Sequence, residues 1–403
     1  MKSDDFTEEG PYLVTGSDFK GPEIDWKECY HCDLSRYEQD PYIQLKEGDL
    51  LITKDGTIGK VALVRRLDGK ATLNSGVFVV RPIKDSYTSR FYFWLLQSSV
   101  FTGFVDFNKT GSTIVHLYQD TFVNFRYALP RVNEQTQIAN FLDRETAKID
   151  ALIEKQQRLI ALLKEKRQAV ISHAVTKGLA PNAPMKDSGV EWLGEVPAHW
   201  EVKKFSHCAS IRNGQVDPTK EPYCNFTLVA PNHIESGTGR LIKCETAAEQ
   251  GADSGKYLCK KGEVIYSKIR PALAKVCIAP SDDTICSADM YPIKGCSGLT
   301  NKFLFWTLLS NWFTSLVVLE SDRVAMPKIN REKLAEVSIP VPPALEQREI
   351  VDEIADKTET MDRLIVRAKM AIELARERRT ALISAAVTGK IDVRDFQQGG
   401  EAA

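Results

Sequence analysis

The chain has 403 residues, of which 43% are hydrophobic and 27% charged, a composition typical of a globular protein with room for two or three domains. The formal net charge of −1 excludes nucleic-acid binding through bulk charge, so any basic surface must be local. No apolar run is long enough to cross a bilayer, and the acidic start MKSDDFTEEG does not resemble a signal peptide. Nine cysteines without regular spacing favour reduced thiols in a cytoplasm.

Residues 1–133 predict a first α+β globule. Alternating β-branched and aromatic residues, with Gly, Asn and Asp between them, are typical of short strands and turns. The stretch KEGDLLITKDGTIGKVALV (46–64) predicts strand, turn, strand, with Gly48 opening the first strand and a hairpin turn at Asp55-Gly56. The aromatic residues of TSRFYFWLL (88–96) lie at helical spacing, which favours the core over a base-stacking platform.

Residues 134–178 predict a first long helix, spanning roughly 135–176. Pro130 bars an earlier start, and Gly178 is suited to the C-terminal stop. Apolar residues recur at a and d positions of a heptad, which predicts coiled-coil character. The expected stripe consists of Ile149, Leu152, Leu159, Leu163 and Val170, broken by Gln156 and Lys166.

Residues 179–345 predict a linker and a second α+β globule. The stretch KGLAPNAPMKDSGVE (177–191) is rich in Gly, Pro and Ser and reads as a joint between two halves. KKGEVIYSKIRPALAKVCIA (260–279) resembles 46–64, with Gly262 in the place of Gly48. TNKFLFWTL (300–308) matches TSRFYFWLL at an offset of 212 positions. The second globule is therefore expected to repeat the first.

Residues 346–392 predict a second long helix, roughly 347–388, followed by a polar tail at 393–403. Prolines at 340, 342 and 343 bar an earlier start, and Gly389 is suited to the stop. Its expected stripe is Met361, Leu364, Ala368, Ala371, Ala375 and Leu382, broken by Arg378. ISAAVTGK (383–390) repeats ISHAVTKG (171–178), and E-Q-x-x-I occurs at 134–138 and 346–350, both at the offset of 212. A gapless internal repeat of this length is expected of helices.

Motifs that would indicate chemistry are incomplete. GTIGK (56–60) lacks the leading glycine and the final Ser or Thr of a phosphate loop, so a nucleotide site is not expected. Cys29-Tyr30-His31-Cys32 has the spacing of half a zinc site without a second pair, so no metal is expected. Asp40-Pro41-Tyr42 is a fragment of an amino-methyltransferase motif and predicts a turn before a strand at Ile43. The remaining cysteines are expected to pack as small hydrophobic residues.

Polar, basic loops are the better candidates for a functional surface. Two occur in each globule, at 54–60 and 108–113 in the first and at 268–270 and 321–323 in the second, with Lys328 near the last of these. Lys and Arg contact phosphates, and Arg, Asn, Ser and Thr read base edges. The candidate DNA-binding residues are Lys54, Thr57, Lys60, Lys109, Ser112, Thr113, Lys268, Arg270, Ser321, Arg323 and Lys328. Solvated loops have the same composition, and the recurrence in both halves is what favours DNA.

The helix motifs carry a family resemblance. L-P-x-x-x-E-Q-x-x-I (129–138) leading to I-S-x-A-V-T-x-G (171–178), with its second copy, resembles the specificity subunits of type I restriction-modification enzymes. DSGVEWLGEVPAHW (187–200) resembles the usual lead-in to a target recognition domain of that family. The resemblance implies two α+β target recognition domains, held apart by two antiparallel coiled-coil helices with a pseudo-twofold repeat. Each domain would read one half of a split DNA site.

The resemblance also implies the partners. Two methyltransferase subunits would modify adenines, and motor-nuclease subunits would join for cleavage, so the chain itself is expected to be non-catalytic and to need no cofactor. A coiled-coil scaffold that binds only proteins is the alternative, and a free-standing methyltransferase or nuclease is a more distant one. The first globule begins almost at YLVTGSDF (12–19), without the lead-in of the second, so DNA binding by the first domain is the less secure expectation.

Overall fold

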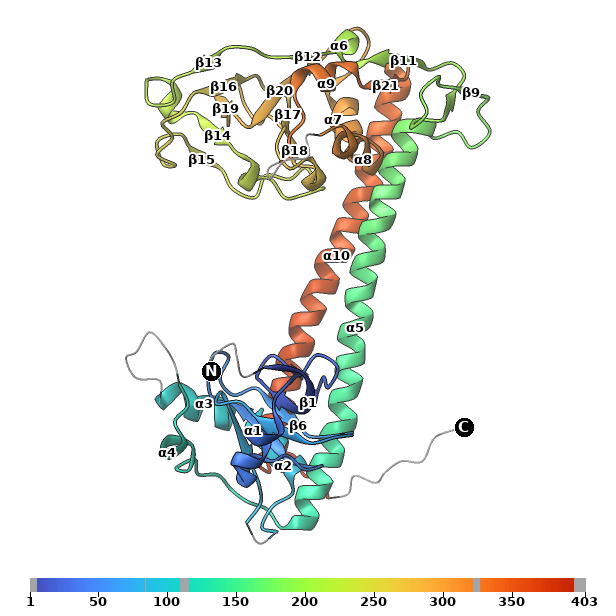
Figure 1. Cartoon of the computed structure of the whole chain (residues 1–403). Coiled ribbons are helices and arrows are strands. Elements are labelled where there is room, and N and C mark those ends of the chain that lie inside the picture. The colour runs from blue at the N-terminus through green and yellow to red at the C-terminus, as the bar shows by residue number, and fades with distance from the viewer. Residues whose placement is uncertain (1–5, 84, 109–115, 322–326, 395–403) are drawn as a thin grey trace. The chain divides into compact units, whose positions relative to one another are not determined.

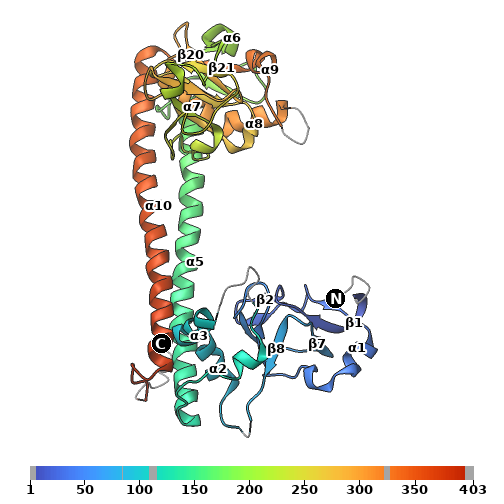
Figure 2. The ribbon, with the colours of Figure 1, turned by 90° about the vertical axis from the view of Figure 1, so that its left-hand side faces the viewer.

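The computed structural model describes residues 6–83, 85–108, 116–321 and 327–394, and it divides into two units. Unit 1 comprises residues 1–157 and 368–403, and unit 2 comprises residues 158–367. Two long helices, α5 (Val132–Lys177) and α10 (Ala344–Val387), contribute one segment each to both units. Within each unit the two segments lie side by side and run antiparallel (Figures 1 and 2). The predicted helix ends at Gly178 and Gly389 are confirmed, with φ of 75° and 71° at these glycines.

Unit 1 holds the first globule, in which short strands form three small sheets with orders β4-β1-β7, β6-β5-β8 and β2-β3. Its helices α2 and α3 pack against the buried face of β5 and β6 and against the unit's segments of α5 and α10. The strands are β1 (Thr7–Val14), β2 (Phe19–Lys20), β3 (Glu23–Ile24), β4 (Tyr30–His31), β5 (Leu50–Thr53), β6 (Val61–Leu63), β7 (Ala71–Leu73) and β8 (Val77–Val80). The helices are α1 (Leu34–Gln39), η2 (Pro41–Ile43), α2 (Ser89–Leu96), α3 (Ser99–Asn108) and α4 (Gln119–Phe122).

Unit 2 holds the second globule, built around a four-stranded sheet β12-β20-β17-β18 and a five-stranded sheet β13-β16-β19-β14-β15. Its first strands are β9 (Met185–Asp187), β10 (Glu195–Pro197), β11 (Glu201–Lys204), β12 (Ala209–Ile211), β13 (Gln215–Val216), β14 (Thr227–Val229) and β15 (Glu245–Thr246). The later strands are β16 (Lys256–Cys259), β17 (Val264–Ser267), β18 (Val276–Ile278), β19 (Thr284–Cys286), β20 (Met290–Gly295) and β21 (Ser338–Val341). The helices are α6 (Phe205–Cys208), η3 (Tyr223–Asn225), η4 (Pro231–His233), η5 (Pro271–Leu273), α7 (Asn301–Leu309), α8 (Asn311–Glu320) and α9 (Arg331–Glu336).

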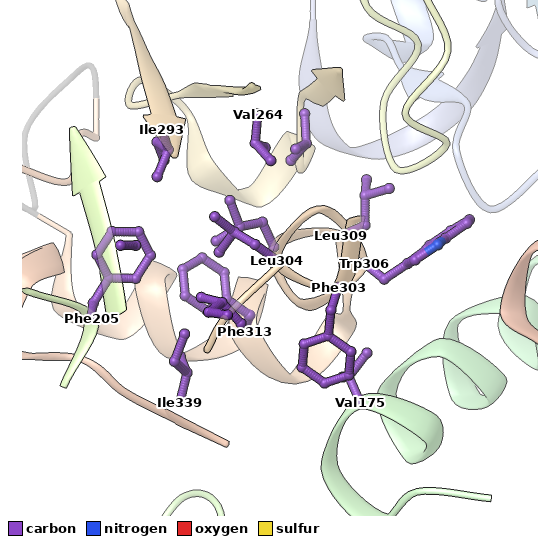
Figure 3. Close-up of a cluster of buried hydrophobic side chains, with 14 of the residues drawn as sticks. Val175, Phe205, Val264, Ile293, Phe303, Leu304, Trp306, Leu309, Phe313 and Ile339 are labelled. Carbon is purple, nitrogen blue, oxygen red and sulfur yellow. The ribbon is translucent and has the colours of Figure 1, made fainter. Parts of the chain in front are cut away.

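The core of unit 2 joins the globule to the long helices (Figure 3). Phe303 and Leu304 of α7 are fully buried and lie among side chains of the sheet and of α8. Val175 of α5 reaches the same cluster, so α7 and α8 lie between the sheet and the long helices. The aromatic residues of 88–96 and 300–308 are accordingly core residues, as the helical spacing predicts, with Trp94 5% and Trp306 8% exposed.

The two globules share part of their strand topology. In unit 1, β5 pairs antiparallel with β6 and β8, and in unit 2, β17 pairs antiparallel with β18 and β20. β1 pairs parallel with β7, as β14 pairs parallel with β19. Gly48 and Gly262 precede β5 and β17 with φ of 87° and 82°, a left-handed conformation that favours glycine. The internal repeat predicted from the sequence is therefore present in both secondary structure and strand pairing.

The buried stripe of each long helix follows a heptad spacing, but one of its two rows differs from the expected one. Leu152 and Leu159 are 47% and 41% exposed, whereas the neighbouring Ile153 and Ile160 are half-buried. Lys166 is exposed and the adjacent Arg167 is buried. Between positions 361 and 375 of α10 the buried residues are Met361, Ile365, Ala368, Ile372 and Ala375, so Leu364 and Ala371 are likewise one position away from the buried row. Adjacent apolar residues leave the phase of such a row open in the sequence.

The glutamine of the first E-Q-x-x-I motif anchors the first globule to α5. Gln135 is fully buried, and its side-chain oxygen accepts a hydrogen bond from the backbone N–H of Thr88 at 2.8 Å. Its amide nitrogen donates to the carbonyl oxygens of Ser86 and Pro130, at 3.3 and 2.9 Å. One buried side-chain amide thus provides hydrogen-bond partners for backbone groups at the N-terminus of α2 and in the segment that enters α5.

Gln347 repeats this anchor in unit 2. It is fully buried, and its side-chain oxygen accepts from the backbone N–H and the hydroxyl of Thr300, at 2.9 and 2.8 Å. Its amide nitrogen donates to the carbonyl oxygens of Gly298 and Pro342, at 2.6 and 2.7 Å. The motif recurs because each long helix begins beside a globule helix whose N-terminus it caps.

Gln347→Ala is expected to lower the free energy of unfolding by about 1–3 kcal/mol, because it leaves buried polar groups without hydrogen-bond partners. Gln157→Ala is the matched control, since Gln157 is exposed on α5 and its loss is expected to cost less than about 0.5 kcal/mol. Urea unfolding of the full chain measures both. Equal unfolding midpoints for the two variants would contradict the anchoring role.

The repeated I-S-x-A-V stretch is the second docking point. The Ser172 hydroxyl oxygen accepts hydrogen bonds from the backbone N–H groups of Asn311 and Trp312, the first two residues of α8, at 3.1 and 3.4 Å. Ser384 accepts from the N–H of Ser99, the first residue of α3, at 2.9 Å. Each serine therefore caps a globule helix from a long helix, and its apolar neighbours are buried beside it.

Residues 201–212 continue the lead-in beyond 187–200 and contribute two strands to the second globule. β11 pairs with β21 and β12 pairs with β20. In unit 1, residues 126–129 stand at the sequence position of β21 and form no strand, and among the described strands β8 pairs only with β5. The first globule lacks these two strand pairs within the residues that the structure describes.

A buried carboxylate at the start of the central sheet has an arginine partner in both globules, but the arginine comes from a different part of the chain in each. In the second globule the lead-in supplies Arg212, which forms an ion pair with the buried Glu263. In the first globule Asp49 occupies the equivalent place, and Arg81 at the end of β8 binds it through Nε and Nη2 at 2.7 and 2.5 Å. This hydrogen bonding raises the pKa of Arg81. The first globule is thus completed differently at this point.

Three smaller expectations are tested by the fold. β5 and β6 form the predicted hairpin, but residues 54–60 connect them, so the tight turn at Asp55-Gly56 is wrong. The residue Ile43 lies in the 3-10 helix η2 and not in a strand, because Asp40 caps that helix through the N–H of Tyr42. Most cysteines are buried or half-buried as expected, but Cys244 and Cys296 are exposed.

The two cysteines of the C-x-x-C motif lie in the interior of the first globule. Cys29 and Cys32 are free and buried, and burial raises the pKa of the Cys29 thiol to about 12.

Among the described residues, no single helix is both long and apolar enough to cross a membrane, and α7 and α8 pass that test only as a bent pair.

Candidate nucleic-acid interface

The loop 54–60 of the first globule is held in shape by one buried threonine. The Thr53 hydroxyl donates to the carbonyl oxygen of Thr57 at 2.6 Å and accepts from the N–H of Lys60 at 3.0 Å. The backbone N–H of Thr53 donates to the carbonyl oxygen of Lys60 at 2.9 Å. Thr57 and Lys60 are exposed on this loop, and the ammonium nitrogen of Lys54 lies 4.7 Å from the ring centre of Phe78. The loop therefore presents its predicted side chains from a fixed backbone.

The residues that follow the second candidate segment of the first globule lie against this loop. The N–H of Leu117 donates to the carbonyl oxygen of Lys54 at 2.9 Å, and His116 forms an ion pair with Asp55. Tyr118 follows with 65% of its surface exposed. Lys109, Ser112 and Thr113 lie outside the described residues.

The second globule brings its two candidate segments together in the same way. The N–H of Ile329 donates to the carbonyl oxygen of Lys268 at 2.9 Å, and the N–H of Arg270 donates to that of Pro327 at 2.8 Å. Ile269 and Lys328 form an isolated antiparallel bridge between these two contacts. Lys268 is half-buried, whereas Arg270 and Lys328 are exposed. Lys54 and Lys268 are equivalent here, since each accepts a backbone hydrogen bond from the later segment.

Arg270 stands at a strained backbone position. Its φ is 47° and that of Ala274 is 42°, and these two left-handed residues flank the 3-10 helix η5. The loop of the first globule makes its bends with glycines at Gly56 and Gly59, which adopt φ of 65° and 81° without a side-chain clash. A non-glycine residue in this conformation costs about 1–3 kcal/mol and is concentrated at functional sites. The guanidinium of Arg270 makes no hydrogen bond or ion pair with the described residues.

The remaining candidates differ in access. Ser321 is only 8% exposed, and its hydroxyl donates to the carbonyl oxygen of Val318 at 2.8 Å, so little of its side chain faces a ligand. Arg323 lies outside the described residues. Among the described residues, no group of three or more His, Cys, Asp or Glu side chains is placed to hold a metal ion.

A cavity beside the first loop contains residues that are not among the DNA-binding candidates of the sequence. It has a volume of about 590 Å³ and is bordered by Lys54 and Phe78, together with Arg36, Tyr42 and Asn74. Tyr42 is 84% exposed. Arg36 and Tyr42 come from α1 and η2, well before the loop in sequence, so no local pattern connects them with Lys54.

These features define a duplicated protein in which two α+β globules, each with a pair of loops that share backbone hydrogen bonds, are fixed to the same two helices. The family model for the type I restriction modification DNA specificity domain matches residues 2–162 and 197–369. The chain therefore belongs to this family, and the resemblance noted in the helix motifs is confirmed. The class is that of specificity subunits, which are not the catalytic subunits.

Two curated relatives carry the same designation. The EcoDI specificity subunit of Escherichia coli, a type I restriction enzyme subunit, is 34% identical over 303 residues, covering 72% of this chain. The match spans 66% of the EcoDI subunit, slightly less than two thirds of its length. The MjaVIII specificity subunit of Methanocaldococcus jannaschii is 26% identical over 369 residues, covering 88% of this chain and 81% of that subunit.

Solved structures support the fold. A chain from a study of complex assembly and conformational transition in the type I restriction-modification system has a TM-score of 0.69 at 18% identity, covering 94% of this chain and 92% of that one. The HsdS subunit from Thermoanaerobacter tengcongensis has a TM-score of 0.54 at 16% identity, with 94% and 90% covered. Likeness at this identity concerns the fold alone.

Proposed function

We propose that this chain is the non-catalytic DNA sequence-recognition subunit of a type I restriction-modification complex. It binds a bipartite double-stranded DNA target, with one half-site for each globule. It directs adenine methylation and cleavage by two methyltransferase subunits and by motor-nuclease subunits, on DNA in the cytoplasm. The observation that carries the proposal is one contact that recurs in both globules: the basic loops 54–60 and 268–270 each accept a backbone hydrogen bond from a later segment, from Leu117 and from Ile329.

The two long helices serve, in this proposal, as an antiparallel coiled-coil spacer between the reading domains. The heptad spacing of their buried residues and the docking of each globule on one segment of both helices support this role. A protein-interaction scaffold would use the same helices, but it would not require a basic loop held by a backbone hydrogen bond at the equivalent position of both globules.

Mapping of N6-methyladenine in a host genome, with and without this gene and in the presence of its methyltransferase partner, tests the proposal. We expect a two-part motif with an unspecified gap that disappears with the gene. A complex that assembles on this chain without producing any modified motif would instead establish the scaffold function.

The isolated chain is expected neither to methylate nor to cut DNA, because its sequence contains neither a glycine-rich cofactor loop nor a recognisable catalytic motif. Methyl transfer from labelled S-adenosylmethionine to the mapped target, measured for the chain alone and for the assembled complex, checks this. Activity of the pure single chain would overturn the non-catalytic assignment.

Arg270→Ala is expected to weaken binding at one half-site by about 1–3 kcal/mol, as for the loss of a bidentate contact to guanine. Arg323→Ala tests the other predicted arginine of this globule in the same assay. Lys261→Ala is the matched control, because it removes the same charge from an exposed residue of the second globule. Equal weakening on all duplexes with a lower salt slope indicates a phosphate contact. Unchanged affinity for every duplex would remove Arg270 from the interface.

A further inference from the structure

Arg167 is a buried cation on α5 that the proposed function leaves without a role. Its side chain is 5% exposed, and its guanidinium lies 5.9 Å from the ring centre of Trp306. Nη1 donates to the carbonyl oxygen of Gly237 at 2.8 Å, and Nη2 donates to that of Thr238 at 3.2 Å. Nε lies 3.3 Å from a carboxylate oxygen of Asp362 on α10. One guanidinium therefore connects both long helices with the 237–238 loop of the second globule.

Stability alone does not account for such a residue. Burial lowers the pKa of Arg167, and Asp362 offsets only part of this effect. A buried ion pair can often be replaced by apolar residues without loss of stability, because desolvation cancels the attraction between the charges. What an apolar residue cannot supply is the planar set of donors that fixes two carbonyl groups at once. The geometry therefore indicates a role in placing the 237–238 loop.

The 237–238 loop, which Arg167 holds, is hydrogen-bonded to the segment 270–274 that carries Arg270. The N–H of Gly237 donates to the carbonyl oxygen of Ala274 at 3.2 Å. Ala274 and Arg270 are the two left-handed residues that flank η5, so three residues separate them. Lys275, next in the chain, donates through Nζ to the carbonyl oxygens of Pro231 and Ile234, at 2.6 and 2.9 Å. A continuous chain of contacts thus runs from α5 to the strained turn.

We propose that Arg167 is a positioning residue for sequence readout: through Gly237 and Ala274 it holds the Arg270 turn at a fixed place relative to the long helices. The inference rests on the proposed function, since Arg270 is taken to contact DNA. It adds that readout by the second globule depends on a helix residue that does not itself contact DNA.

Unit 1 provides a matched control. Arg379 is the repeat equivalent of Arg167, and its Nε donates to Asp150, the equivalent of Asp362, at 2.9 Å. It lies 5.8 Å from the ring centre of Trp94, the equivalent of Trp306. Its side chain is 28% exposed, and among the described residues it makes no hydrogen bond to a carbonyl group of the first globule. Arg379→Ala therefore removes an ion pair and a ring contact like those of Arg167, but it breaks no hydrogen bond to a loop of the globule among the described residues.

The test compares binding of the full chain, assembled with its methyltransferase partners, to duplexes altered in one mapped half-site. Arg167→Ala is expected to reduce the contribution of the second half-site about tenfold and to leave the first unchanged. In an Arg270→Ala background the same change is expected to reduce affinity by less than about twofold, because both residues then act on one contact. Additive losses, equal losses at both half-sites, or an equal effect of Arg379→Ala would overturn the proposal.

Amide hydrogen exchange on the full chain provides a readout that does not depend on DNA. Faster exchange at Gly237 and Ala274 is expected in Arg167→Ala and not in Arg379→Ala. Unchanged exchange at both amides would overturn the positioning role of Arg167 even if DNA binding is confirmed. Failure of the unmodified complex to bind any specific duplex would overturn the proposed function alone.

If Arg167→Ala does not fold, Arg167→Lys keeps the charge but cannot hold both carbonyl groups, and a smaller loss confined to the second half-site is expected.

Discussion

Insertion of four residues after Leu163 in α5 and four after Ile365 in α10 is expected to lengthen the unread gap between the half-sites by about one to two base pairs. A helix rises about 1.5 Å per residue, so four residues add about 6 Å. Duplex DNA advances about 3.4 Å per base pair. The bases read in each half are expected to stay the same, because the loops that carry Lys54 and Arg270 are untouched.

The insertion points follow from the ion pairs between the helices. Arg167 lies opposite Asp362 in unit 2, and Arg379 lies opposite Asp150 in unit 1. Both pairs fit one antiparallel register, in which the point after Leu163 faces the point after Ile365. The repeat equivalent of Leu163 in the sequence is Ala375, but that residue does not face it. Facing insertions leave both ion pairs in register, although four residues still perturb the heptad phase locally.

The same insertion in α5 alone is the control. It displaces one helix against the other by one turn, so at least one ion pair and its buried neighbours lose their partners, and reduced stability is expected in place of a longer gap. Mapping of methylated sites of the double insertion decides the outcome. Altered half-site bases at an unchanged gap would show that the helices do not set the spacing.

The long helices and the repeat could be predicted from the sequence because their signal is periodic and local. The helix stops at Gly178 and Gly389 and the buried aromatic residues of α2 and α7 follow from patterns within a few turns, and the repeat follows from direct comparison of two such patterns 212 positions apart. The phase of the buried row could not be predicted between Leu152 and Ile153, because both are apolar and adjacent. Packing of the second helix selects between them, and that is a long-range effect.

The candidate interface was predictable only as separate loops. Charge and polarity indicate 54–60 and 268–270, but the hydrogen bonds from Leu117 and Ile329 that pair each loop with a later segment are tertiary contacts. The role of Arg167 could not be predicted from the sequence for the same reason. Beside Lys166 in a charged helix it resembles a solvated residue, and the groups that surround it, Trp306, Asp362 and the 237–238 loop, all come from distant stretches of the chain.

Trp200→Ala is expected to destabilise the second globule by about 3–5 kcal/mol, the range for removing a large buried aromatic side chain. Trp200 belongs to the lead-in stretch, is fully buried, and packs edge-on against Phe303 with ring centres 6.4 Å apart. Its ring also lies so close to Gly178, at the end of α5, that a Cβ there would stand 3.2 Å from it. The lead-in thus closes the junction between α5, α7 and the sheet of unit 2.

Trp192→Ala is the matched control, because Trp192 lies in the same lead-in but is 48% exposed, and its carbonyl group, which accepts from Trp312, is retained. A cost below about 1 kcal/mol is expected there. Urea unfolding followed by amide exchange separates the two globules: Trp200→Ala is expected to release the amides of β17 and β20 and to leave those of β5 and β8 protected. Because the first globule forms its core without the two lead-in strands, a loss confined to unit 2 is the physical expectation. Equal destabilisation by both tryptophan variants, or equal release in both units, would show that the lead-in is not an integral part of the second globule.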